Sequence, residues 1–186
     1  MNAYATTVKR GFIDCSKMGI DNRQLSTIMH DKNGLQFMVN GFFGCRWKQY
    51  KKELEELPQT TMEQTTFDFD NIIKTNNHEK HEKIEVTKND LLLLKNLPKY
   101  RKLYKNCFGS VTPIYIFGIY IDAKLLWQFY NITKFKSAFI DYSYIGTLIL
   151  NNDKFDGILL PVRINDDNEK EKIKEQTRNF LESIKN

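Results

Sequence analysis

The chain has 186 residues, a formal net charge of +5 and 41% hydrophobic residues, values typical of one globular domain with a core. No apolar segment reaches the length of a membrane span, and the first residues lack the pattern of a secretory signal. The three cysteines Cys15, Cys45 and Cys107 are widely spaced, which argues against a disulfide framework and against a cysteine zinc site. We therefore expect a cytoplasmic protein that does not associate with membranes.

The N-terminal part alternates short apolar segments with turn signals. A helix is predicted from Gln24 to Met29, after the capping residues Asp21-Asn22. Asn33-Gly34 is typical of a tight turn, and Leu35 to Phe43 has the composition of a strand.

A second helix is predicted from Cys45 to Leu57. Its apolar residues recur at helical spacing and would form one buried face. These residues are Trp47, Tyr50, Leu54 and Leu57.

The most polar stretch of the chain covers residues 74–83 and contains His78 and His81. Such a composition predicts an exposed loop. We expect a single domain over residues 1–186, with a subdomain boundary in the polar segment 74–86.

A longer helix is predicted after this loop. Thr87 and Asp90 have the spacing of a capping box at its start. Pro98 should kink the helix or divide it in two. The apolar residues of the helix share one side, and they are Leu93, Leu97, Tyr100, Tyr104 and Phe108.

The basic residues of the chain concentrate in this helix. Residues 88–105 contain six basic side chains and one acidic side chain, a net charge of +5, the same as that of the whole chain. Four of the lysines fall within a narrow arc at 100° per residue, and Tyr100 and Tyr104 lie close to them in the sequence. This pattern favours contact with the phosphate backbone of DNA or RNA. The candidate binding residues are Lys88, Lys95, Lys99, Arg101, Lys102 and Lys105.

The C-terminal half predicts the centre of the fold. Ile114 to Ile121 is an apolar run without alternation, which is typical of a strand covered on both faces. A helix over residues 125–132, a strand or hairpin over 138–150, a strand over 155–164 and a last helix after Asp166-Asp167 should follow. Together these elements predict an α+β domain with a mixed or antiparallel sheet and flanking helices.

Asp122-Ala123-Lys124 follows the apolar run, and this triplet resembles the acid-x-lysine motif of the PD-(D/E)xK nucleases. The resemblance implies that Asp122 would help to hold Mg²⁺ and that Lys124 would steady the attacking water or the phosphate. The family also places a second acid upstream. Here that acid would be Asp90, Asp68 or Asp70.

Three functions therefore stay open after the sequence analysis. Nucleic-acid binding by the basic helix is the first, and a Mg²⁺-dependent nuclease centred on Asp122 and Lys124 is the second. The third is a protein-interaction factor without catalytic activity, such as an inhibitor or an assembly subunit. The sequence contains no glycine-rich phosphate-binding loop and no recognisable nucleophile motif.

Overall fold

The computed structural model describes residues 28–31, 33–39, 42–57, 81–105, 111–142 and 146–185. These residues form a seven-stranded antiparallel sheet with the strand order β1-β2-β3-β9-β8-β7-β4. The α+β fold with an antiparallel sheet is therefore confirmed. The strands are β1 (Met29–His30), β2 (Gln36–Val39), β3 (Phe43–Trp47), β4 (His81–Glu85), β7 (Ser137–Asp141), β8 (Thr147–Asn151) and β9 (Phe155–Leu159).

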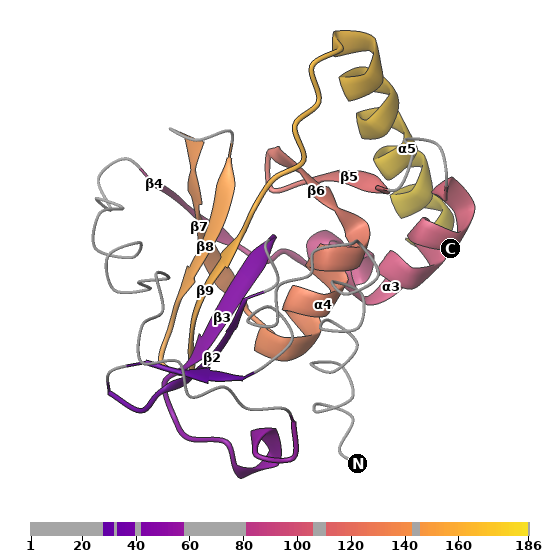
Figure 1. Cartoon of the computed structure of the whole chain (residues 1–186). Coiled ribbons are helices and arrows are strands. Elements are labelled where there is room, and N and C mark those ends of the chain that lie inside the picture. Colours follow the sequence, from indigo (N-terminus) through magenta and orange to yellow (C-terminus); the bar gives the residue numbers. More distant parts are fainter. Residues whose placement is uncertain are drawn as a thin grey trace.

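In the described part of the chain, three α-helices and a hairpin accompany the sheet. Helix α4 lies against one face of the sheet, and α3 and α5 lie farther from the sheet, beyond α4 (Figure 1). Among the described helices, none combines the length and the apolar composition needed to cross a bilayer. The elements are α3 (Lys88–Tyr104), α4 (Ala123–Thr133), α5 (Asp167–Lys185), and the hairpin strands β5 (Pro113–Ile116) and β6 (Ile119–Asp122).

The core lies between the sheet and α4. Phe43 on β3 meets Phe129 on α4 edge to face, with ring centroids 6.0 Å apart. Gly157 on β9 lets the sheet approach this ring, because a Cβ at this position would come within 2.8 Å of Phe129. Close packing at this point fixes the position of α4 on the sheet.

The run from Ile114 to Ile121 is not one central strand, as the sequence suggested, but the hairpin β5–β6. Phe117 and Gly118 both have positive φ angles, 58° and 78°, as the two central residues of a tight hairpin turn require. The four isoleucines of the hairpin are buried, and the intervening Tyr115 and Tyr120 form a ring pair with centroids 4.9 Å apart. The run therefore has alternating faces within a hairpin.

The helix predicted from Cys45 to Leu57 is also wrong. The segment forms the end of β3 and the short 3-10 helix η2 (Lys52–Leu54). Trp47, Leu54 and Leu57 are buried, but Tyr50 is 57% exposed. All five residues of β3 lie opposite a residue of β9 in an antiparallel pair. This long-range pairing overrides the local helical spacing.

Several smaller expectations have mixed outcomes. Met29, predicted as helical, lies in β1, whereas the remaining residues of that prediction up to residue 27 lie outside the described ranges. Residues 81–83, predicted as loop, belong to β4. The segment 138–150 contains the hairpin β7–β8, and β9 ends at Leu159, before Pro161. Helix α3 continues through Pro98 without a break.

Candidate nucleic-acid interface

The N-terminus of α3 is fixed by the capping box that the sequence predicts. The Asp90 N–H donates to Thr87 Oγ1 at 3.1 Å, and the Thr87 N–H donates to Asp90 Oδ2 at 2.9 Å. These bonds satisfy two backbone donors that would otherwise lack partners at the helix start. This cap fixes the residue at which α3 begins, and the starting residue determines which side of the helix each later side chain occupies.

One side of α3 packs into the protein and the opposite side faces solvent. Leu93, Leu94, Leu97 and Tyr100 are buried on the inner side. The lysines of the outer side are exposed and fall within an arc of about 60° at 100° per residue. They are Lys88, Lys95, Lys99 and Lys102. We call these four lysines, with the half-exposed Arg101 and the exposed Lys105 beside them, the basic face of α3.

Within the described residues, no acidic side chain neutralises the charges of the basic face. Within the ranges that the structure describes, none of its six side chains forms an ion pair. The one acid of the helix, Asp90, is occupied at the N-terminal cap. A phosphate could therefore approach these cations without displacing an acidic partner that the structure describes.

The tyrosines of α3 lie on the inner side of the helix, with the apolar residues, as their helical spacing predicted. Tyr100 is fully buried, and its hydroxyl donates to the Pro113 carbonyl at 3.0 Å. Its ring meets Phe180 of α5 edge to face, with centroids 5.2 Å apart. Tyr104 is half-buried, and its hydroxyl donates to the Gln176 carbonyl at 3.4 Å. Both rings join α3 to the rest of the fold.

Helix α5, in contrast to α3, carries equal numbers of acidic and basic side chains and pairs several of them within the helix. Its 19 residues contain five acidic and five basic side chains. Three of its four lysines pair with acids three residues earlier, each at 2.7 Å, and the hydrogen bond from Lys174 to Glu171 raises the pKa of this lysine. The pairs are Asp167–Lys170, Glu171–Lys174 and Glu182–Lys185.

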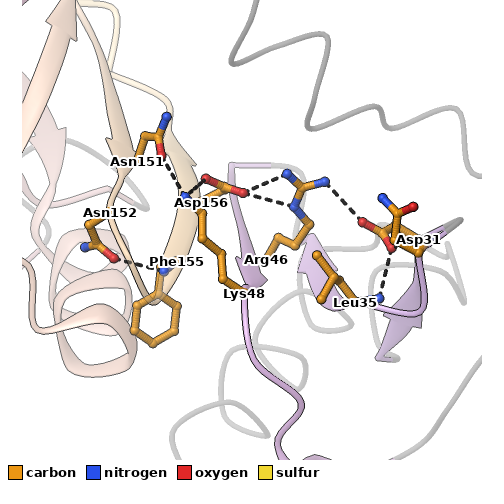
Figure 2. A network of polar contacts seen from close by, with 9 residues as sticks. Asp31, Leu35, Arg46, Lys48, Asn151, Asn152, Phe155 and Asp156 are labelled. Atoms are coloured by element: carbon orange, nitrogen blue, oxygen red, sulfur yellow. Dashed lines mark hydrogen bonds and ion pairs between the residues drawn. The ribbon is translucent and has the colours of Figure 1, made fainter.

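A second group of cations lies on the sheet, and it is also neutralised. Arg46 on β3 donates to Asp156 on β9 at 2.7 Å and to Asp31 at 3.1 Å (Figure 2). Lys48 lies 3.1 Å from the other oxygen of Asp156. Two cations and two carboxylates balance, and Arg46 and Asp156 are buried. This network joins the start of the sheet to its centre and offers no free charge to a ligand.

Asp122 and Lys124 lie where the hairpin passes into α4, but Asp122 is the N-cap of this helix. Its Oδ1 accepts the N–H groups of Lys124 at 2.7 Å and Leu125 at 3.1 Å. Its Oδ2 accepts the Thr112 N–H at 3.1 Å. Both oxygens of this buried carboxylate thus bind backbone donors, and Lys124 belongs to the first turn of the helix.

The upstream acids named by the nuclease resemblance do not complete a site in the described part of the chain. Asp90 is the capping residue of α3, and Asp68 and Asp70 lie outside the described residues. Among the described residues, no three His, Cys, Asp or Glu side chains converge to form a metal site. The nuclease hypothesis stays a prediction.

Comparison with known proteins gives no further guide to function. No family model, no curated protein and no solved structure matches this chain.

Proposed function

We propose that the protein binds nucleic acid through the basic face of α3. The observation that supports this proposal is the alignment of four exposed lysines that have no acidic partner among the described residues. Lys88 and Lys102 are 14 positions apart, or about 21 Å along the helix axis. Phosphates along a nucleic-acid backbone form a comparable row of negative charges. Such contacts would recognise the charge and the shape of the backbone and would not depend on the base sequence.

The aromatic residues of α3 indicate whether the basic face is better suited to a duplex or to a single strand. Proteins that bind single strands stack bases on exposed aromatic rings. Tyr100 and Tyr104, the aromatic residues of α3, are turned toward the protein interior. The basic face therefore favours backbone contact with a duplex over stacking on unpaired bases.

A salt series with two matched variants tests the proposal. Binding of a fluorescent duplex is measured by anisotropy for the unmodified chain and for the triple variant Lys95→Gln, Lys99→Gln, Lys102→Gln. If each lysine neutralises one phosphate, the slope of log affinity against log salt becomes shallower by about 2.7. Because glutamine keeps most of the side-chain stem and the helix propensity, the melting temperature should stay the same.

The control variant removes three charges from α5 instead, by Lys170→Gln, Lys172→Gln and Lys185→Gln. It has the same net charge as the first triple variant, but its lysines lie outside the basic face. Its slope should match that of the unmodified chain. Equal losses in both variants would assign binding to net charge alone, and an unmodified chain that binds no duplex would leave docking on another protein as the first hypothesis.

A further inference from the structure

A pocket of about 320 Å³ lies between the start of α3, the tip of the β5–β6 hairpin and the middle of α5. Its walls combine two aromatic rings, Tyr115 and Phe117, with two cations, Lys174 and Arg178, and one acid, Asp90. Thr177 and leucine and isoleucine side chains from the three elements complete the lining. Apolar walls with a few polar groups of opposite sign are the composition of a small-molecule site, and the volume is at the lower end for such sites.

Phe117 is an unusual residue for its position. Its φ angle is 58°, a left-handed conformation that is costly for a bulky side chain and that asparagine or glycine adopts with less strain. The ring contacts Phe135 edge to face at 6.1 Å and also lines the pocket. The hairpin therefore places an aromatic ring at the pocket, although asparagine or glycine would adopt this backbone conformation with less strain.

The cations of the pocket come from one helix. Arg178 is exposed and forms no ion pair within the described residues. Lys174 is one turn earlier, 2.7 Å from Glu171, with its Nζ 5.3 Å from the centroid of the Tyr115 ring. Arg178 lines the pocket, and a guanidinium can donate two parallel hydrogen bonds to a phosphate.

Asp90 gives the pocket an acceptor on the opposite helix. Its Oδ2 accepts both the N–H and the hydroxyl of Thr87. Its Oδ1 accepts no hydrogen bond from the described residues. This oxygen can accept an N–H or O–H of a ligand, and it would repel a ligand whose only polar group is a carboxylate.

We propose that this pocket binds a single nucleotide, either free or unpaired at the end of a strand. A nucleotide has a planar base for the rings, a phosphate for Arg178, and amino and hydroxyl donors for Asp90. An acidic peptide fits less well because Asp90 opposes its carboxylates. The residues that line the pocket are not those of the basic face of α3. Nucleotide binding by the pocket and duplex binding by the basic face can therefore occur independently of each other.

The test is calorimetric titration of the full chain with AMP and with adenosine. Arg178→Gln should weaken AMP binding by about tenfold, the loss of one charge-assisted contact to phosphate, and should leave adenosine binding unchanged. Lys172→Gln, a charge change on the same helix outside the pocket lining, should change neither. Equal effects of Arg178→Gln on AMP and adenosine would overturn the phosphate assignment and with it the proposal.

A second variant removes the ring without straining the turn. Phe117→Asn places at φ 58° a residue that accepts this conformation, so the chain should fold and lose affinity for both AMP and adenosine. Undiminished binding in this variant would overturn the proposal. So would a pocket that ignores AMP and binds an acetylated Phe-Asp dipeptide.

The two sources of a nucleotide are separated by competition. A duplex with a one-nucleotide 5′-phosphorylated overhang should displace AMP better than the same duplex with blunt ends if the pocket takes strand ends. Equal displacement identifies the free nucleotide as the ligand. The Lys95, Lys99, Lys102 triple variant should keep its AMP affinity, and Arg178→Gln should keep the salt slope for blunt duplex, so failure of either proposal is distinguishable.

Discussion

The basic face of α3 and the Asp122 turn at the start of α4 are two charged regions that differ in what their charges already contact. The exposed lysines of α3 face solvent without acidic partners in the described chain. Asp122 is 5% exposed and accepts three backbone N–H groups. A ligand can replace water at the first region at little structural cost, because these lysines form no ion pair with the described residues.

A metal ion at the second region would have to share the Asp122 oxygens with the backbone donors that hold the hairpin and the helix in place. Each of these backbone donors would lose its acceptor if a metal ion took its place, and an unpaired buried N–H costs free energy. Charge type and spacing in the sequence are therefore a weaker guide to a binding site than the number of unoccupied donors or acceptors. The predictions that follow test each side of this comparison.

The largest effect concerns the orientation of α3, on which the exposure of the lysines depends. Leu97 is fully buried and Leu103 is 66% exposed. Leu97→Ala should lower the free energy of unfolding by about 2–5 kcal/mol, and Leu103→Ala should change it by less than about 0.5 kcal/mol. Urea denaturation measures both. Similar losses for the two variants would mean that α3 is rotated and that the basic face is not on the surface.

The next effect concerns Asp122. Asp122→Ala removes the cap and leaves the buried Thr112 N–H without its acceptor, so it should lower the free energy of unfolding by about 1–3 kcal/mol. Asp122→Asn keeps one oxygen for the cap and should cost less. Thermal denaturation compares the two variants.

The same pair of variants addresses the nuclease hypothesis. Plasmid nicking by the unmodified chain in Mg²⁺, absent in EDTA and lost in the folded Asp122→Asn variant, would support a metal-binding Asp122 despite its cap. If the unmodified chain cleaves neither DNA nor RNA of any form, the nuclease hypothesis fails, and Asp122 has the structural role that its hydrogen bonds describe.

The predictable parts of the protein were those whose local sequence and tertiary contacts agree. In α3, the Thr87 capping box, the apolar side and the lysine arc all favour one helix in one orientation, and the structure has this helix. The same holds for α5, which begins after Asp166 as the sequence indicated. The Glu169 N–H donates to the Asp166 carboxylate at 2.8 Å.

The unpredictable parts depend on residues distant in the sequence. Arg46 lies within the segment predicted as a helix, but its partner Asp156 is 110 positions away on a neighbouring strand. The hairpin turn at Phe117-Gly118 was hidden because a phenylalanine stands where a turn normally has asparagine or aspartate. Gly118 was the one available signal. The pocket beside this turn joins three elements, and no local pattern brings Asp90 and Arg178 together.

The smallest expected effect comes from removing one charge from the basic face and, in a matched variant, one charge from the Asp122 turn. Lys99 lies at the centre of the basic face, between Lys95 and Lys102, whereas Lys124 is in the first turn of α4. If Lys99 contacts one phosphate, Lys99→Gln should weaken duplex binding by about eightfold at 0.1 M salt and reduce the salt slope by about 0.9. Lys124→Gln removes the same charge and should leave both values unchanged, because Lys124 lies outside the arc.

Anisotropy titrations at three salt concentrations measure the difference. A loss in the Lys124 variant as large as that in the Lys99 variant would move the contact surface toward the Asp122 turn, and the contrast between the two regions would no longer hold.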